Sequence, residues 1–217
     1  MANVCHLKVE RKKFTSGAQA NSTGVLISGG RYVLTAAHNV YSPFYNRAKR
    51  IELRCGVADA DAVEPQRVAT YRQASAAPGY FWRKFHRDFA LIRLDAPLPQ
   101  VVPSRIALFA PDASAAVRIA GFPGDDDAAT PYNGRRLYGG EGQGRMDGVM
   151  LRYLIDTFPG NSGGPVWQDE AGEMRILGVH VEGTGSSGAA RAVDPGFITD
   201  IEAMMRKLEE RAARQSR

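Results

Sequence analysis

Gly160-Asn161-Ser162-Gly163-Gly164-Pro165 lies between an apolar segment that ends at Ile155 and another that begins at Val166. Glycine tolerates positive φ and lets other backbone atoms approach closely, so this stretch can form a tight turn that exposes the serine hydroxyl. The N–H groups of Gly160 and Ser162 can then point into one small space. Such donors stabilise the negative oxygen that forms when a carbonyl carbon is attacked. The alternative is an ordinary glycine-rich hairpin that contains a serine by chance.

A serine hydroxyl becomes a good nucleophile when a base takes its proton and a carboxylate orients that base. The chain offers both groups upstream of Ser162. Thr35-Ala36-Ala37-His38 follows an apolar run, and Asp88-Phe89-Ala90-Leu91-Ile92 places a carboxylate at the start of an apolar strand. Alone, such a histidine is more often structural and such an aspartate is usually a cap. The three together predict a catalytic triad.

These segments resemble the three signature segments of chymotrypsin-like serine proteases, and the resemblance extends over roughly residues 20 to 205. It implies that His38 is the general base and acid, Asp88 the orienting carboxylate and Ser162 the nucleophile. It also implies that the backbone N–H groups of Gly160 and Ser162 form the oxyanion hole. The expected activity is hydrolysis of peptide bonds in a polypeptide substrate through an acyl-enzyme.

Many short strands, a central group of prolines and a helical pattern at the end indicate an all-β fold with a terminal helix. The resemblance implies two packed six-stranded antiparallel barrels of the chymotrypsin type with a C-terminal α-helix. We expect residues 1–110 to form the first barrel, with His38 and Asp88, and residues 111–217 to form the second, with Ser162. The prolines that mark the crossing between the halves are Pro97, Pro99, Pro103 and Pro111.

The end of the chain changes from strand to helix periodicity. Apolar residues recur at helical spacing from Ile198 to Leu208, which predicts a helix over about residues 199–213, packed on the second half. Thr199 or Asp200 is available as its cap. The glycine-dense stretch 139–144 is expected to form a mobile loop.

Substrate preference is expected to depend on residues just before Ser162 and on the strand after it. Thr157 and His180 resemble the pair that binds an acidic side chain in the glutamyl endopeptidase branch of the family, and both can donate hydrogen bonds to a carboxylate. His180 could instead pack in the barrel and donate to a backbone carbonyl. Asp156 leaves open a trypsin-like preference for Arg or Lys, and Glu182 adds a second negative charge nearby.

The residue before the nucleophile is Asn161. In trypsin-like zymogens an aspartate in this position pairs with a newly cut amino terminus and so forms the oxyanion hole. An asparagine carries no charge for such a pair. We therefore expect the enzyme to work without that activation step.

The composition is typical of a soluble globular protein, with 44% hydrophobic and 24% charged residues among 217. The net charge of +5 lacks the interleaved aromatic residues that favour nucleic-acid binding, so we expect no nucleic-acid partner. No apolar run approaches the roughly 20 residues of a membrane span. No cofactor or metal motif is present. The oligomeric state remains open.

The start of the sequence lacks the apolar core and cleavage site of a secretory signal, which favours the cytoplasm. The alternative is a secreted protein of which Met1 begins the mature domain. Cys5 and Cys55 are too few for a disulfide framework, so we expect both to be reduced and buried in strands, although a single bridge between them remains possible. Two other function classes also stay open: a catalytically silent peptide-binding module and a basic scaffold for nucleic acid.

Overall fold

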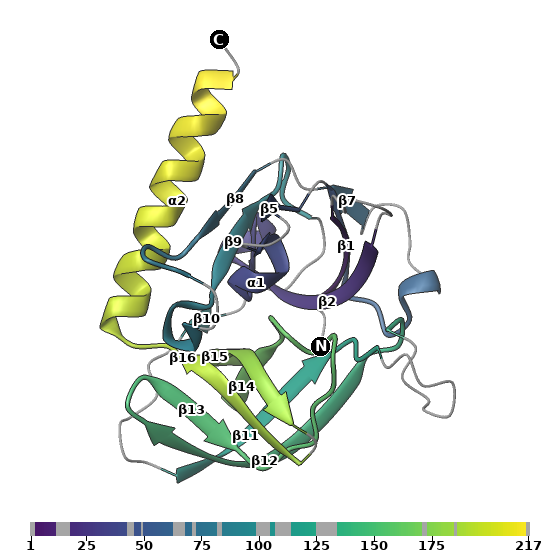
Figure 1. The fold of residues 1–217 in the computed structure, drawn as a ribbon, viewed down its shortest axis with the longest axis vertical. Helices are drawn as coiled ribbons and strands as arrows, with labels where there is room; N and C mark the ends of the chain where they lie inside the picture. The colour runs from purple at the N-terminus through teal and green to yellow at the C-terminus, as the bar shows by residue number, and fades with distance from the viewer. Residues whose placement is uncertain are drawn as a thin grey trace.

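A computed structural model of the chain describes residues 3–11, 18–42, 46–48, 50–62, 68–70, 73–81, 84–98, 105–106, 114–124, 134–170, 173–184 and 186–215. It contains two β-sheet halves, one above the other in Figure 1, and a long C-terminal helix that runs beside the first half. Short elements connect the main strands: α1 (Ala37–Val40), the strand pair β4 (Tyr41–Ser42) and β5 (Asn46–Arg47), and the 3₁₀ turns η1 (Ser28–Gly30), η2 (Ala60–Ala62) and η4 (Phe85–Arg87).

The first sheet has seven antiparallel strands in the order β7-β6-β1-β2-β3-β9-β8. Its end strands follow each other along the chain, since β7 ends at Thr70 and β8 begins at Gln73, so the sheet curls on itself into a half-barrel. The strands are β1 (Val4–Arg11), β2 (Ala18–Ile27), β3 (Tyr32–Thr35), β6 (Arg50–Cys55), β7 (Val68–Thr70), β8 (Gln73–Ala76) and β9 (Ala90–Arg93).

The second sheet also has seven strands, in the order β10-β15-β14-β11-β12-β13-β16. An additional pairing of β15 with β16 closes six of them into a barrel, and β10 lies outside this ring, parallel to β15. The strands are β10 (Arg105–Ile106), β11 (Ser114–Gly121), β12 (Tyr138–Asp147), β13 (Met150–Tyr153), β14 (Pro165–Glu170), β15 (Glu173–Thr184) and β16 (Ser187–Ala192).

The predicted fold class is confirmed: two packed antiparallel β halves and one C-terminal helix form a chymotrypsin-like fold. The division of the chain at residue 110 falls outside the described residues and stays a prediction. Strand β10, at residues 105–106, already pairs with the second sheet although it precedes that division.

The glycine-dense stretch 139–144 is part of strand β12, so the expectation of a mobile loop is wrong. Its alternate glycines, Gly140, Gly142 and Gly144, lie against the apolar interior of the second barrel. A Cβ atom at Gly140 or Gly142 would lie 2.5 or 2.8 Å from side-chain carbons of Ile155, and one at Gly144 would lie 2.9 Å from Val117. The glycines therefore make room for larger apolar neighbours inside a narrow barrel.

The C-terminal helix α2 spans Pro195–Gln215, so it begins earlier than predicted. The carboxylate of Asp194 caps it by accepting a hydrogen bond of 2.7 Å from the N–H of Phe197. Thr199 is the fifth residue of the helix, and its hydroxyl donates to the carbonyl of Pro195, one turn earlier. Within the described residues, no helix combines the length and apolar character that a membrane span requires.

Helix α2 packs mainly along β8 and β9 of the first half (Figure 1), so the expectation that it packs on the second half holds only in part. Its buried face joins a core shared by both halves, with Leu34 and Leu91 from the first and Ile176 and Val179 from the second. At the edge of this contact, Glu209 accepts hydrogen bonds from Arg93 and from the Tyr32 hydroxyl. The residues of the buried face are Phe197, Ile201, Met204 and Leu208.

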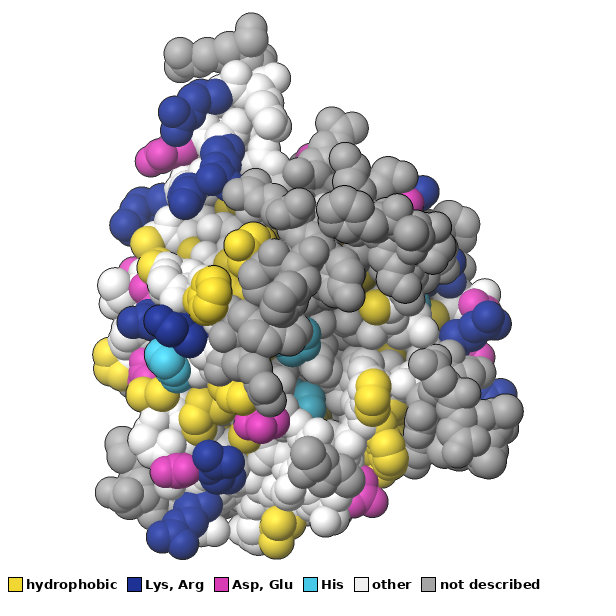
Figure 2. All heavy atoms as spheres, viewed as in Figure 1, with side chains coloured by type: hydrophobic (Ala, Val, Ile, Leu, Met, Phe, Trp, Pro, Cys, Tyr) yellow, Lys and Arg dark blue, Asp and Glu magenta, His cyan; other side chains and the backbone are white. Residues whose placement is uncertain are grey.

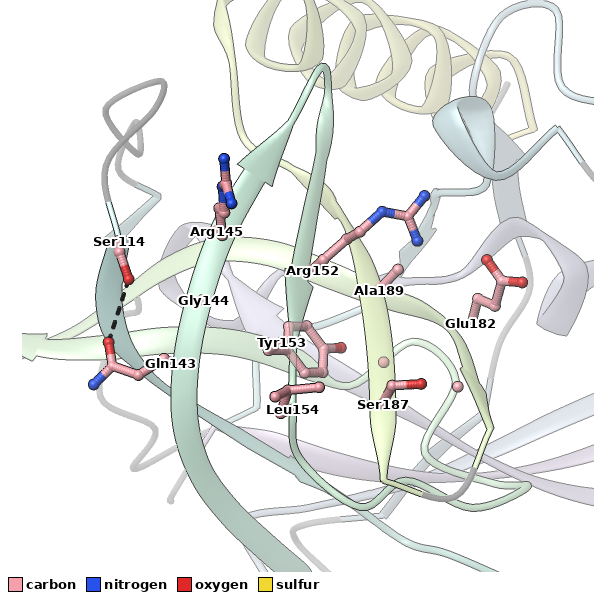
Figure 3. Close-up of a pocket in the computed structure, with 12 residues that line it drawn as sticks. Ser114, Gln143, Gly144, Arg145, Arg152, Tyr153, Leu154, Glu182, Ser187 and Ala189 are labelled. Carbon is pink, nitrogen blue, oxygen red and sulfur yellow. Dashed lines mark hydrogen bonds between the residues drawn. The ribbon is translucent and has the colours of Figure 1, made fainter.

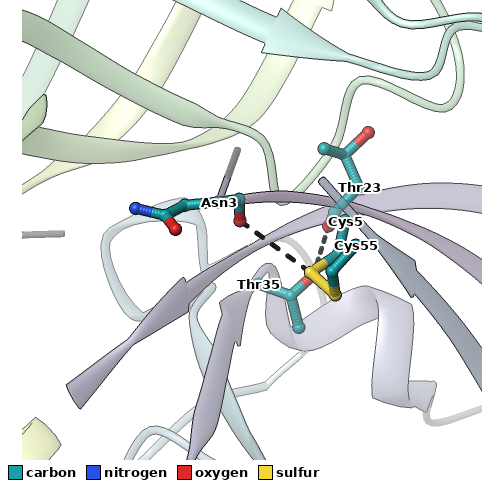
Figure 4. The surroundings of a disulfide bond; sticks show 5 residues. All are labelled: Asn3, Cys5, Thr23, Thr35 and Cys55. Atoms are coloured by element: carbon teal, nitrogen blue, oxygen red, sulfur yellow. Dashed lines mark hydrogen bonds between the residues drawn. A yellow bond between two sulfur atoms is a disulfide. The ribbon is translucent and has the colours of Figure 1, made fainter. Parts of the chain in front are cut away.

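Cys5 and Cys55 form a disulfide bond (Figure 4), so the expectation that both are reduced is wrong. Both are fully buried in strands, as expected. They lie directly opposite each other on the antiparallel strands β1 and β6, with 3.9 Å between their Cα atoms. The pairing of β1 with β6, which joins segments 50 residues apart, is what brings the two thiols together.

Candidate active site

His38 and Asp88 meet in the first half, at the face that adjoins the second. His38 lies on α1, directly after β3, and Asp88 lies between η4 and β9. The His38 Nδ1–H donates to Asp88 Oδ2 at 2.6 Å, and the backbone N–H of His38 donates to Oδ1 at 2.9 Å. Asp88 is only 2% exposed, whereas the His38 side chain is 28% exposed. The carboxylate is therefore held by two bonds, and it fixes the orientation of the His38 ring.

Arg191 holds the segment around Asp88 from the second half. This buried side chain of β16 donates through Nε to the carbonyl of His86 at 2.9 Å, and its guanidinium lies over the ring of Phe89. It also forms an ion pair of 2.8 Å with Asp194. Burial alone would raise the pKa of Asp194, but the bonds from Arg191 and from the helix N–H of Phe197 outweigh burial and lower that pKa.

Ser162 lies in a turn whose conformation depends on glycine. Gly160 and Gly163 have φ values of 100° and 88°, and a Cβ at Gly160 would lie 2.8 Å from the backbone nitrogen of Gly124. The N–H groups of Asn161, Gly163 and Gly164 all donate to backbone carbonyls. Among the described residues, those of Gly160 and Ser162 have no hydrogen-bond partner.

The first half also binds the Ser162 turn directly. The carbonyl oxygen of Ser162 accepts hydrogen bonds from the backbone N–H of Thr23, at 3.0 Å, and from Asn39 Nδ2, at 2.8 Å. Asn39 adjoins His38 in the chain, so the serine and the histidine segments are joined across the interface. Figure 2 shows histidine side chains reaching the surface near the centre of this face, where the two halves meet.

Thr157 and His180 lie together behind the strand segment that contains Gly183. A Cβ atom built on Gly183 would overlap Thr157 Oγ1 and would lie 3.2 Å from His180 Cε1. Both residues are 2% exposed. The Thr157 hydroxyl has no hydrogen-bond partner within the described part of the chain.

His180 packs in the barrel, as the alternative expected, and within the described residues its ring is bonded to a tyrosine hydroxyl. Its Nδ1 lies 2.5 Å from Tyr153 Oη, and this contact is buried. Burial, with a smaller contribution from the charge of His38, lowers the pKa of His180 to about 3, and burial raises the pKa of Tyr153 well above its ordinary value. At neutral pH both groups are therefore uncharged.

The two carboxylates that could reverse substrate preference, Asp156 and Glu182, are both exposed. A hollow of about 510 Å³ lies beside the Tyr153 ring and is lined by Glu182, Gly183 and Arg152 among others (Figure 3). In that view the Glu182 side chain projects toward the top and not toward Tyr153. This hollow borders the Thr157 and His180 pair without including either residue.

The structure thus brings together His38 with Asp88, Ser162 with the turn of Gly160, and Thr157 with His180. Three further residues at these places, Thr23, Tyr153 and Arg191, were missed by sequence reasoning. Tyr153 follows the inward alternation of Leu151 and Ile155, which predicts its burial but not its partner. No local pattern signals the contacts of Thr23 with Gly160 or of Arg191 with His86, because these partners lie far away in the chain.

The family model for the trypsin-like peptidase domain matches residues 22–179. Among solved structures, a Glu endopeptidase in complex with MPD has a TM-score of 0.76 and 24% sequence identity, with 93% of this chain and 89% of that chain covered. A thermostable serine protease, AL20, from an extremophilic microorganism has a TM-score of 0.75 and 15% identity, with 94% and 97% covered. The protease Anisep from Arthrobacter nicotinovorans has a TM-score of 0.75 and 17% identity, with 92% and 94% covered.

A search of curated protein sequences finds no significant match. At these identities the solved structures show the shared fold, and the family model, which spans most of the chain, shows the family. The chain therefore belongs to the trypsin-like peptidase domain family and is a serine endopeptidase.

Proposed function

We propose that Ser162 attacks the peptide carbonyl to form an acyl-enzyme, with His38 as general base and acid and Asp88 as the orienting carboxylate. The observation that carries this proposal is the bond of 2.6 Å from His38 Nδ1 to Asp88 Oδ2. A proton held on Nδ1 leaves Nε2 unprotonated in the neutral ring, which is the form that accepts the serine proton. The buried carboxylate then stabilises the imidazolium that results.

The oxyanion hole is assigned to the backbone N–H groups of Gly160 and Ser162. Both lack a partner among the described residues, while the N–H groups of Asn161, Gly163 and Gly164 donate to the carbonyls of Phe158, His180 and Asn161. Donors that are already oriented cost no reorganisation when negative charge develops on the substrate oxygen. This supports a hole that is formed before substrate binds.

For substrate preference, Thr157 and His180 are assigned to bind the carboxylate of a glutamate or aspartate before the cut. The unpartnered Thr157 hydroxyl supplies one donor. The Tyr153 hydroxyl can donate to His180 Nδ1, which places the proton of the neutral ring on Nε2 and supplies a second donor. The first solved structure named above is a Glu endopeptidase, which supports the same assignment.

Cleavage after Arg or Lys through Asp156 is the second candidate, favoured by the exposure of that carboxylate. A catalytically silent peptide-binding module is the third. A mixed peptide library, digested by the wild type, by Ser162→Ala and by Thr157→Val and read by mass spectrometry, separates them. We expect cuts after Glu or Asp that vanish with Ser162→Ala. Cuts after Arg or Lys would instead assign recognition of the substrate side chain to Asp156.

Labelling by a fluorophosphonate probe provides the control for chemistry without turnover. The wild type is expected to react at Ser162, and the Ser162→Ala variant is the matched blank. A wild type that neither reacts nor cuts any peptide would contradict the proposed function and favour the silent module.

The disulfide between Cys5 and Cys55 is informative about where the protein is located, in the cytoplasm or outside the cell. Disulfides persist in oxidising surroundings and are rare in the cytosol of mesophiles. This supports the secreted alternative over the cytoplasm. Thiol labelling of protein taken directly from its host, with and without reductant, tests this, because labelling of both cysteines before reduction would favour the cytoplasm.

A further inference from the structure

We infer that Thr23, a residue of the first half, positions the oxyanion hole of the second. The inference rests on the proposed function and adds a positioning residue to it. Thr23 is fully buried at the interface between the halves. It lies on β2, and its own backbone N–H donates to the carbonyl of Ser162.

The Thr23 hydroxyl forms two hydrogen bonds across the interface. It donates to the carbonyl oxygen of Gly160 at 2.7 Å and accepts from the backbone N–H of Phe122 at 2.9 Å. Its donor and acceptor functions are therefore both directed at the second half. The backbone of the same residue is also bonded, since its N–H donates to Ser162 and its carbonyl accepts from Thr35 Oγ1.

The two bonds constrain the peptide groups on either side of the Gly160 Cα. The bond to the Gly160 carbonyl holds the peptide that follows it. The bond from Phe122 holds the start of Phe122-Pro123-Gly124, and the N–H of Gly124 in turn donates to the carbonyl of Pro159 at 2.7 Å. Because a trans peptide is planar, a fixed Pro159 carbonyl directs the N–H of Gly160 to the opposite side.

Gly160 needs this constraint because a glycine has the widest choice of φ and ψ. If the Pro159–Gly160 peptide rotated, the N–H of Gly160 would leave the oxyanion hole. Rotation of the Gly160–Asn161 peptide would break the bond from the N–H of Asn161 to the Phe158 carbonyl and so distort the turn that holds Ser162. The neighbouring Asn161 carries no charge, and its buried side-chain oxygen has no partner in the described part of the chain. The constraint thus comes from a neutral hydroxyl on the other half of the protein, so the oxyanion hole depends on how the two halves are docked.

The test compares Thr23→Val, which removes the hydroxyl, with Thr23→Ser, which keeps it. Thr35→Val is the matched control, because Thr35 is also fully buried and its hydroxyl binds Thr23 and Asn39 but not Gly160. The readouts are kcat and KM on the peptide that the library identifies, and the inhibition constant of a peptide boronic acid, whose tetrahedral adduct occupies the oxyanion hole.

We expect Thr23→Val to lower kcat about 10- to 100-fold with KM within about threefold of wild type, because loss of one oxyanion donor costs at most about 100- to 1,000-fold. Binding of the boronic acid should weaken in proportion to kcat/KM, which a merely structural role would not produce. Thr23→Ser should restore most of the activity. Thr35→Val should lose less than Thr23→Val.

The inference is overturned if folded Thr23→Val keeps kcat within about threefold of wild type, or if it loses no more than Thr35→Val. Should Thr23→Val fail to fold, Thr23→Ala removes the same hydroxyl and is judged by the same limits. A wild type that neither cleaves nor reacts with fluorophosphonate overturns the proposed function as well. Active wild type with an unaffected Thr23 variant overturns only the positioning role.

Discussion

Two buried threonine hydroxyls in this protein differ in their hydrogen bonding. Thr23, between the two halves, has both its donor and its acceptor function occupied, by Gly160 and Phe122. Thr157, behind Gly183, is just as inaccessible but has no partner among the described residues. A buried hydroxyl without a bond costs free energy, so it is kept where a ligand is expected to complete it.

The same contrast separates the proposed catalytic residues from the proposed pocket. His38 and Asp88 are joined by two bonds before any substrate arrives, and the Ser162 carbonyl is held by Thr23 and Asn39. In the pocket, the His180 ring is neutral and, among the interactions of the described residues, is bonded only to the Tyr153 hydroxyl. The site is therefore preorganised for the reaction and incomplete for recognition.

The largest expected effect is that of Asp88→Asn. An asparagine amide in place of Oδ2 favours the wrong tautomer of His38, so kcat should fall by about 10⁴-fold while the cleavage pattern stays the same. Kinetics on the preferred peptide measure this. Asp200→Asn is the control, because Asp200 forms an ion pair of 2.6 Å with Arg87, beside the same segment, and should change kcat by about twofold at most. A loss below tenfold for Asp88→Asn would contradict the assignment.

The second effect concerns stability and not chemistry. The double variant Cys5→Ala, Cys55→Ala opens a disulfide whose cysteines are 50 residues apart, and it should lower the free energy of unfolding by about 2–4 kcal/mol. Urea unfolding of wild type and variant checks the value. Because the disulfide lies in the core of the first half, kcat of the folded variant should be unchanged. A large fall in kcat at a temperature where the variant is folded would show that the disulfide also affects the geometry of the active site.

The third effect tests the unpartnered hydroxyl. Thr157→Val should lower kcat/KM for a glutamyl peptide about 10- to 100-fold, since a hydrogen bond to a charged group contributes about 1.5–3 kcal/mol. Thr157→Ser, which keeps the hydroxyl, is the control, and labelling of Ser162 by fluorophosphonate should persist in both.

The same variant distinguishes the two threonines by stability. Thr157→Val should not lower the free energy of unfolding, because no bond of the described residues is lost. Thr23→Val leaves the part-buried carbonyl of Gly160 and the buried N–H of Phe122 unpaired and should lower the free energy of unfolding by about 1–3 kcal/mol. If urea unfolding showed equal losses in the free energy of unfolding for Thr157→Val and Thr23→Val, the two hydroxyls would not differ in their hydrogen bonding as described.

The last effect is the acid dependence of stability, which is absent at neutral pH. The pKa of His180 is lowered from 6.5 to about 3 in the folded protein, chiefly by burial. Above about pH 6.5 the ring is neutral in both states. As the pH falls from 6.5 toward 3, the unfolded chain takes up a proton that the folded one does not, so stability is lost by up to about 1.4 kcal/mol per pH unit.

His180→Gln should therefore show a flatter decline between pH 6.5 and 4 than the wild type. Unfolding by urea at several pH values measures the slope. His6, whose pKa burial also lowers, contributes in the same direction and remains in both proteins, so part of the decline persists. Parallel curves for wild type and variant would show that His180 is not held neutral.

Much of the fold and of the candidate site could be predicted from the sequence because the informative features are local. The Ser162 turn needs glycines at fixed neighbouring positions, and His38 and Asp88 each stand beside an apolar strand. The Gly139–Gly144 stretch misled because glycine is usually read as a loop signal. Its meaning depends on Ile155 and Val117, which fill the space that the glycines leave.

By itself, the sequence determined the order of histidine, aspartate and serine, the family, the all-β class and the presence of a terminal helix. Only the tertiary structure decided that Cys5 meets Cys55, that α2 packs mainly on the first half, that Tyr153 binds His180 and that Thr23 reaches Gly160. The last pair is 137 positions apart in the chain. Such contacts follow from how strands are paired and how the two halves are docked, and no local pattern of residues records either.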